Sequence, residues 1–425
     1  MRDLVEIGMG RTARRTYELD DVDIVPSRRT RSSKEVSTAW QLDAYRFDIP
    51  VLAHPTDALV SPAFAVELGR AGGLGVINGE GLWGRHADVD AVIARLVDIA
   101  ENDPDPSAAI AYLQELHAAP LQADLLAAAV AQVRDSGVTT AVRVSPQNAR
   151  ALTPELVKAG IDLLVVHGTI ISAEHVAHGE SEPLNLKTFI SELDVPVVAG
   201  GVSDHRTALH LMRTGAAGVI VGFGSTHGAT TTSASLGIGV PMATAIADAA
   251  AARRDYLDET GGRYVHVIAD GDVETSGDLA KAIACGADAA VLGAPLAIAA
   301  EAPGRGWYWP SAAAHPSLPR GAALQVAFDE RPSLERVLTG PSDDPYGSLN
   351  FVGVCDGRWR SRDTRISRNS RRSGCRCAPD RFRRDVVAGC DNVRCSAQMS
   401  HPATFSSSDL QFLQPSVTVR MPLCA

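Results

Sequence analysis

Three glycine-containing segments in the second half of the chain each follow an apolar run. Residues 221–241 read VGFGSTHGATTTSASLGIGVP, residues 269–272 read ADGD, and residues 292–295 read LGAP. The first is far longer than the usual loop of about two to six residues. Glycine permits close backbone approach and hydroxyl groups donate hydrogen bonds. Such segments could hold a phosphate group through backbone N–H groups and a helix N-terminus, although glycine also simply ends strands.

Titratable and nucleophilic side chains lie near the same places. His54, His167, His227 and His266 fall at or near the ends of apolar runs and could titrate near neutrality. A structural or solvated imidazole is the alternative for each, and His167 and His227 are the two expected at loops that line a site. Cys285 lies inside the helical pattern AKAIACGA, where a small buried thiol is expected rather than a nucleophile.

These loops need a scaffold, and the apolar runs provide one. Eight short runs alternate with helical patterns; they begin at Phe47, Gly73, Thr139, Asp162, Pro196, Gly218, Tyr264 and Ala289. Each is almost entirely apolar, as is typical of a parallel strand buried on both faces. Eight βα repeats within about 250 residues indicate an α/β fold, the (β/α)₈ TIM barrel, whose site lies at the carboxyl ends of the strands. A doubly wound open sheet is the alternative.

Two segments depart from the repeat. Residues 82–136 are longer than one crossover needs and read as two or three Ala-rich helices around a DPDP turn, a helical insertion after strand two of the barrel. After about residue 350 the chain becomes rich in Arg, Ser and Cys and loses periodicity. We therefore expect a barrel over residues 1–349 and a disordered tail over 350–425. Cys375 and Cys377 are too closely spaced for a zinc knuckle, so no metal site is expected.

The composition fits a globular, water-soluble chain. Hydrophobic residues make up 45% of the 425 residues, and the net charge is −10, which argues against binding to nucleic acid or to anionic membranes. No stretch approaches the roughly 20 apolar residues of a membrane span, and the N-terminus lacks the apolar core of a signal peptide. We expect a cytoplasmic protein.

Several stretches resemble the IMP dehydrogenase/GMP reductase family over roughly residues 6–349. They are YELDDVDIVPSR near Tyr17, IPVLAHPTDALVSPAFAVELGRAGGLGVING, and VHVIADGDVETSGDLAKAIACGADAAVLGAPLA. The chain is most similar to the branch of IMP dehydrogenase-related proteins that lack regulatory CBS domains. The resemblance implies IMP as substrate, NAD as hydride acceptor, a potassium ion at the catalytic loop, and a homotetramer.

Part of the family's site is carried over. Asp270 matches the aspartate that holds the ribose hydroxyls of IMP, a role suited to a carboxylate. Gly271 and Gly293, the latter followed by Ala294, match glycines whose N–H groups face the 5′-phosphate. Gly222 and Gly224 match the start of the catalytic loop.

Other positions differ from the family's pattern. Thr230 aligns with the cysteine whose thiolate attacks the purine, and a threonine hydroxyl is far less nucleophilic without a strong base nearby. His167 aligns with the aspartate that meets the nicotinamide side, and Asp272 with a second phosphate-facing glycine. The segment GWYWPSAAAHPSLPRG replaces the Arg-Gly-Met-Gly flap that supplies the base for hydrolysis.

Two functional hypotheses follow from this mixture. The first is an NAD-linked purine-nucleotide oxidoreductase, for which IMP to XMP is the family reaction, with a degenerate site. The second is a catalytically inactive barrel that binds a purine nucleotide and has a regulatory or assembly role. Retention of Asp270, Gly271 and Gly293 favours nucleotide binding in both.

The tail suggests a shift of reading frame after about Gly353. Related proteins end in a stretch like Asp-Leu-Lys-Glu-Phe-Gln-Lys-Val-Gly-Leu, whereas residues 365–375 read RISRNSRRSGC. Codons permitted for these residues give almost the family ending when read two bases later. The alternative is a true basic, cysteine-bearing tail that binds a partner.

Overall fold

The computed structural model describes residues 4–25, 37–105, 107–168, 184–224, 228, 232–271, 273–327, 331–339 and 365–368. The residues divide into two compact units, 1–15 with 370–425, and 16–369. In the first, β1 (Leu4–Gly8) and β2 (Arg11–Arg14) form an antiparallel hairpin. The second holds the barrel and the candidate site.

The barrel consists of eight parallel strands that close on themselves. In chain order they are β6 (Val51–Ala53), β7 (Leu74–Asn78), β8 (Ala141–Val144), β9 (Leu163–His167), β10 (Val197–Val202), β11 (Gly218–Val221), β12 (His266–Ala269) and β13 (Ala289–Leu292). All eight expected strands are present, and β13 pairs with β6 to close the ring. The prediction of a TIM barrel is confirmed, and the open doubly wound sheet is excluded by this closure.

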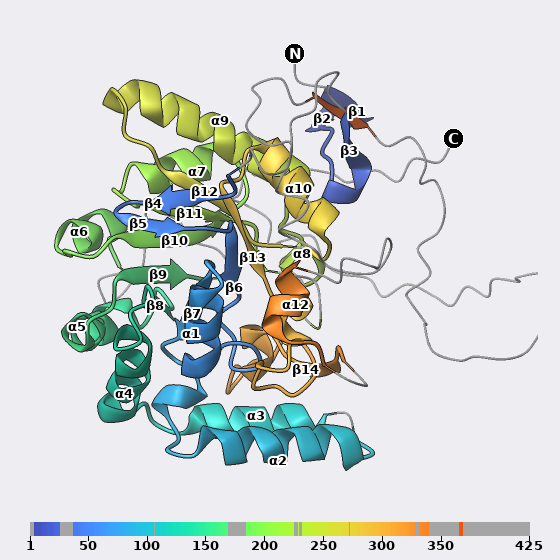
Figure 1. Ribbon diagram of the computed structural model, residues 1–425. Helices are drawn as coiled ribbons and strands as arrows, with labels where there is room; N and C mark the ends of the chain where they lie inside the picture. The colour runs from blue at the N-terminus through green and yellow to red at the C-terminus, as the bar shows by residue number, and fades with distance from the viewer. Residues whose placement is uncertain are drawn as a thin grey trace, which may run out of the picture. The chain divides into compact units, whose positions relative to one another are not determined.

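Helices cover the outside of the barrel (Figure 1). They are α1 (Pro62–Arg70), α5 (Ala149–Ala159), α6 (Leu186–Ser191), α7 (His205–Met212), α9 (Met242–Thr260) and α10 (Ser276–Cys285); the short helices α8 (Thr232–Leu236) and α11 (Ala294–Ala297) follow β11 and β13. Side chains of Ser61, Asp204 and Thr275 accept hydrogen bonds from the first-turn N–H groups of α1, α7 and α10. These hydrogen bonds satisfy backbone N–H donors that the start of a helix leaves unpaired. They fix the direction in which the chain enters each of these three helices.

Two apolar layers result from the alternation of side chains along the strands. Outward-facing residues pack against the helices in one large core. Inward-facing residues such as Leu52, Val165 and Ile268 form a second core inside the ring. The hairpin of β4 (Trp40–Leu42) and β5 (Tyr45–Phe47) contributes Trp40 and Phe47 to this inner core. The barrel interior is therefore packed, which leaves the carboxyl ends of the strands as the place for a site.

The expected insertion after the second strand contains three helices, α2 (Val89–Asn102), α3 (Ala108–Ala118) and α4 (Ala123–Arg134), preceded by η3 (Leu82–Gly84). Helices α2 and α3 lie side by side as a hairpin (Figure 1). Polar contacts join α3 to the rest of the domain: Gln114 Nε2 donates to the carbonyl oxygen of Pro316 at 2.9 Å, and His117 Nε2 lies 3.4 Å from Asp57 Oδ2. His117 and Asp57 are both buried.

The remaining elements lie outside the barrel strands, in the residues before β4 and after β13. They are η1 (Leu19–Asp21), β3 (Val22–Val25), β14 (Trp307–Tyr308), η4 (Ser311–Ala314), β15 (Leu324–Gln325), α12 (Leu334–Thr339) and β16 (Arg365–Arg368). β16 pairs antiparallel with β3. This strand lies within the tail that the sequence predicts to be disordered, and the rest of that tail is outside the described residues.

Candidate active site

Polar side chains gather where the barrel strands end. His54 follows β6, Glu80 follows β7, Arg143 lies near the end of β8, His167 ends β9, and Asp270 follows β12. The strands are parallel, so all these ends meet at one rim of the barrel. This rim is the candidate active site.

Asp270 is a deeply buried carboxylate of the rim, with 3% of the residue exposed. Its backbone N–H donates to Val221 O at 2.7 Å, and its carbonyl oxygen accepts from Gly224 N at 3.1 Å. Gly222 has φ +109°, and a Cβ there would lie 2.1 Å from the Asp270 carbonyl oxygen. Gly222 and Gly224, expected at the start of a catalytic loop, thus pack on the backbone of Asp270 and hold it in place.

His167 faces this carboxylate from β9. Its Nε2 lies 3.4 Å from Asp270 Oδ2, and the two side chains are 13% and 4% exposed. Nε2 makes no hydrogen bond within the described residues, so the imidazole lies beside an acceptor without fully bonding to it. His167, which was expected to line a site, lies at this rim.

The expectation that the rim histidines titrate near neutrality is wrong for the described ones. Burial, together with the charge of Arg143, lowers the pKa of His54 to about 4. Burial, Arg143 and His54 lower the pKa of His167 to about 3. Desolvation disfavours the cation and a nearby guanidinium disfavours it further. Both imidazoles are therefore neutral at physiological pH.

His266 was expected near the top of a strand, and this is also wrong. It begins β12 and so lies at the amino-terminal end of the barrel, where Trp40 and Tyr264 contact its ring. Burial lowers its pKa against the opposing effect of Asp288. The run YVHVIADG was read correctly as a strand, but its histidine precedes the strand's buried centre.

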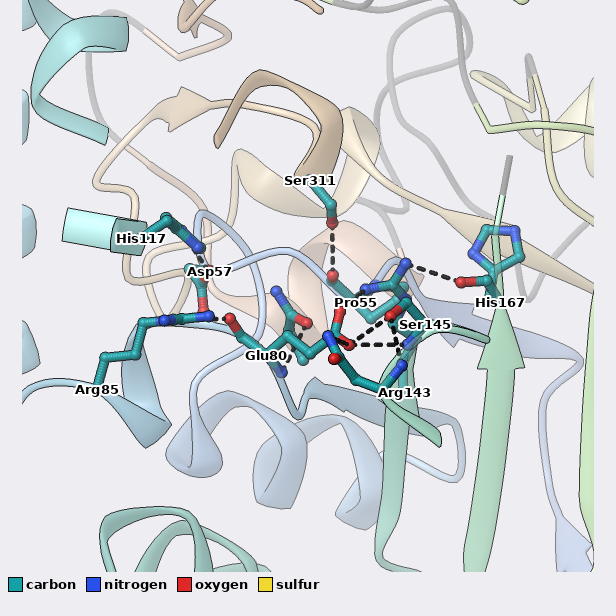
Figure 2. Close-up of polar contacts among 11 residues, drawn as sticks. Pro55, Asp57, Glu80, Arg85, His117, Arg143, Ser145, His167 and Ser311 are labelled. Carbon is teal, nitrogen blue, oxygen red and sulfur yellow. Dashed lines mark hydrogen bonds and ion pairs between the residues drawn. The ribbon is translucent and has the colours of Figure 1, made fainter. Parts of the chain in front are cut away.

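An ion pair between Arg143 and Glu80 lies beside His167 (Figure 2). Arg143 Nη1 is 3.1 Å from Glu80 Oε2, and Arg143 Nη2 donates to the carbonyl oxygen of His167 at 2.8 Å. The sequence analysis missed this pair. The available signal was a charged residue in the otherwise apolar strand AVRV, since a buried arginine needs a partner.

The expected phosphate region lies where β12 and β13 end. A Cβ on Gly293 would lie 2.5 Å from the Tyr308 hydroxyl oxygen, and one on Gly271 would lie 3.2 Å from Met242 Sδ. Ala294, the residue after Gly293, begins α11 and is buried. The backbone of Gly293 is thus directly against a hydroxyl group, and a side chain at this position would fill the space between them.

Tyr308 comes from the segment that replaces the family's flap, and the sequence analysis did not single it out. Its hydroxyl lies 3.4 Å from His54 Nδ1. Burial and the Asp270 charge raise the pKa of Tyr308, so the phenol stays protonated and can donate. Thr56 Oγ1 donates to Trp309 O at 2.6 Å. Ser311 Oγ donates to Pro55 O at 2.9 Å (Figure 2). The segment is therefore fastened to the loop that follows β6.

The other residues expected from the sequence lie either in a helix or outside the described residues. Cys285 ends α10 and is partly buried, and burial raises the pKa of its thiol to about 11, which agrees with a structural rather than a nucleophilic role. Thr230, His227 and Asp272 lie outside the described residues. Among the residues that the structure does describe, no group of three or more His, Cys, Asp or Glu side chains could hold a metal ion, and no helix is long and apolar enough to cross a membrane.

A closed parallel barrel with a polar rim at its carboxyl ends defines a TIM-barrel protein. The family model described as the IMP dehydrogenase / GMP reductase domain matches residues 16–316. The chain therefore belongs to the IMP dehydrogenase/GMP reductase family, and the resemblance noted in the sequence is confirmed.

Individual relatives agree with this assignment. A Mycolicibacterium smegmatis protein named an uncharacterized oxidoreductase is 80% identical over 350 residues, which cover 82% of this chain and 93% of that protein. The crystal structure of an IMP dehydrogenase/GMP reductase-like protein from Corynebacterium glutamicum matches with a TM-score of 0.78 and 61% identity, over 83% of this chain and 92% of that one. Inosine-5′-monophosphate dehydrogenase of Haemophilus influenzae is 41% identical over 152 residues, 35% of this chain and 28% of that enzyme. The family and the names of these relatives support a related oxidoreductase.

Proposed function

We propose that this chain is an oxidoreductase of purine nucleotides that binds an IMP-like ligand across the ends of β12 and β13. One observation carries the proposal: the buried Asp270 follows β12 at the rim, and the Tyr308 hydroxyl, whose pKa the Asp270 charge raises, lies against the backbone of Gly293 at the end of β13. A carboxylate can accept two ribose hydroxyls, and backbone N–H groups with a phenol can donate to a phosphate. The two halves of a nucleotide would thus meet complementary groups.

The side chains of the rim also indicate what the site can do to a bound nucleotide. Asp270 orients the ribose, while the neutral imidazoles of His54 and His167 can each donate or accept one hydrogen bond at the reacting end. Tyr308, protonated, donates toward the phosphate side. These groups position a ligand, whereas the thiolate that opens the family reaction is replaced by Thr230.

For NAD, the residues at the end of β9 do not fit the family's pattern. His167 stands where the family has the aspartate that meets the nicotinamide side, and burial keeps it neutral. NAD as hydride acceptor, potassium at the loop and a homotetramer are therefore supported by the family relationship alone. The family reaction, IMP to XMP, has the same support.

A second function is favoured by these replacements, namely a catalytically inactive barrel that binds a purine nucleotide. Thr230 in place of the cysteine and His167 in place of the aspartate remove two groups on which the family reaction depends. Such a barrel would retain the Asp270 site and use nucleotide binding for regulation or assembly.

A thermal-shift panel on the full chain tests nucleotide binding with IMP, XMP, GMP, NAD and NADP. A ligand at 100 times its Kd stabilises the folded state by about 2.7 kcal/mol. Asp270→Asn should abolish the shift caused by a purine nucleotide. Asp162→Asn is the matched control, because Asp162 precedes β9 at the opposite end of the barrel and accepts from Thr140 N. An unchanged shift in Asp270→Asn would place the ligand elsewhere.

Steady-state turnover then separates the two functions. IMP-dependent reduction of NAD that disappears in Asp270→Asn would support an oxidoreductase. Nucleotide binding without reduction of NAD would support the inactive barrel. Absence of any nucleotide-induced shift would contradict both.

A further inference from the structure

Arg143 is a charged residue in a strand whose other members, Ala141, Val142 and Val144, are fully buried. Its side chain is only 15% exposed, as is that of Glu80. The guanidinium is held at two points, by the Glu80 carboxylate at 3.1 Å and by the His167 carbonyl oxygen at 2.8 Å. Burying a cation is costly unless it is paired and hydrogen-bonded, so this arrangement has a fixed geometry.

Glu80 is itself oriented from the next loop. Its Oε1 accepts from Ser145 N at 3.2 Å, Ser145 Oγ at 2.6 Å and Asn148 Nδ2 at 2.6 Å, which leaves Oε2 for Arg143 (Figure 2). Burial opposes the ionisation of Glu80, but Arg143 and these hydrogen bonds outweigh it, so the pKa of Glu80 is lowered. The carboxylate thus stays charged and aims the guanidinium at β9.

We propose that Arg143, oriented by Glu80, is a positioning residue that holds His167 in its neutral form and thereby keeps the Asp270 carboxylate for the hydroxyl groups of the ligand. The inference rests on the nucleotide site proposed above. It concerns a pair of residues that acts through His167 and does not itself touch the ligand.

The surroundings of His167 explain why Arg143 matters. Three charged or titratable groups from three other elements face the imidazole: Arg143 of β8, His54 after β6, and Asp270 after β12. Asp270 alone would attract a proton to Nε2, 3.4 Å away. Arg143 and burial oppose that proton. Removing the guanidinium therefore shifts the balance toward a protonated His167.

Protonation would change what the ligand meets. An imidazolium at this distance forms an ion pair with Asp270 and competes with ribose hydroxyls for the same carboxylate oxygens. A neutral imidazole leaves the carboxylate charge intact and contributes one weaker hydrogen bond. Nucleotide affinity should thus stay constant across neutral pH in the wild type and become pH-dependent when Arg143 is replaced.

NMR of protein labelled at its histidine residues tests, without any ligand, whether Arg143 keeps His167 neutral. The His167 ring resonance, assigned by its loss in His167→Gln, should stay constant from about pH 8 to about pH 5.5 in the wild type. In Arg143→Met it should titrate, with a midpoint moved toward the ordinary value of about 6.5. The double variant Glu80→Gln with Arg143→Met removes both charges together, and gives the same readout should the single variant fail to fold.

Arg253→Met is the matched control. Arg253 is also 15% exposed, pairs with Asp288 at the opposite end of the barrel, and faces His266. It should shift the titration of His266 and leave His167 unchanged. A His167 resonance that stays constant in both Arg143 variants, while Arg253→Met shifts His266, would overturn the proposal.

Binding of IMP tests the second half of the proposal. Burial still lowers the pKa of His167 in Arg143→Met, so IMP should bind more weakly at pH 5.5 than at pH 7.5 by at most about tenfold, the limit reached if the pKa returned fully to its ordinary value. Arg143→Lys, which keeps the charge, should restore most of the pH independence. A wild type that does not bind IMP contradicts the proposed function, whereas the NMR result still decides the role of Arg143. Equal pH dependence in wild type and Arg143→Met would refute the link to Asp270.

Discussion

Mild acid should destabilise this protein through His54 and His167, and the size of the effect follows from their burial. In the unfolded chain each imidazole has a pKa of about 6.5, whereas in the folded protein the values are about 4 and about 3. Below about pH 6.5 the unfolded state binds more protons, so stability falls as the pH falls toward the folded values. The penalty is absent above that pH. At pH 5.5 it amounts to about 1.4 kcal/mol for each histidine.

The variant His167→Gln isolates one of these two contributions. Urea unfolding followed by circular dichroism at pH 7.5 and pH 5.5 gives the loss of stability on acidification. This loss should be smaller by about 1.4 kcal/mol in His167→Gln than in the wild type. His210→Gln, at an exposed position on α7, controls for the loss of an imidazole as such. An equal loss of stability in wild type and His167→Gln would refute the reasoning and show that His167 accepts a proton in the folded state.

Three further predictions follow from the site and the tail. Thr230→Cys alone should not produce IMP-dependent reduction of NAD at a rate typical of the family, because His167 and the replaced flap remain; robust turnover would show that the thiol suffices. Gly293→Ala should weaken nucleotide binding measured by calorimetry, and overpacking should also lower the free energy of unfolding by roughly 1–3 kcal/mol, because its Cβ would lie 2.5 Å from the Tyr308 hydroxyl oxygen; an unchanged Kd would argue against a phosphate at this place. Sequencing the gene should show codons for residues 365–375 that encode the family ending in another frame, and codons that cannot do so would end the frameshift hypothesis.

The scaffold was predictable because its signals are local. An apolar run such as DLLVVHG and the helical pattern that follows it each report on their own conformation, and eight repetitions indicate a closed barrel. The position of Asp270 at a strand end could be foreseen in the same way. The error over His266 came from the same reasoning, because a run of apolar residues does not show at which end of the strand its single polar residue lies.

The electrostatic part of the site was not predictable, because it depends on pairs that are distant in the chain. Glu80 and Arg143 are separated by an entire helical insertion, and the direct pairing of β7 with β8 brings them together. Burial, and after it the charge of Arg143, lowers the pKa of His167, so the imidazole could not be recognised as neutral from the sequence. Tyr308 was missed for a similar reason, since its role depends on its contact with Gly293.

The hydrogen bonds of the Tyr308 segment, residues 306–321, affect how this side of the candidate site can open. Hydrogen bonds join the segment to the loop after β6, and the same loop places Asp57 against His117 of α3. Gln114 of α3 holds the end of the segment as well. Local unfolding proceeds in cooperative units that share contacts. The Tyr308 segment and the α2–α3 hairpin share these contacts, so we expect them to open as one such unit, at a free energy to which helix packing contributes.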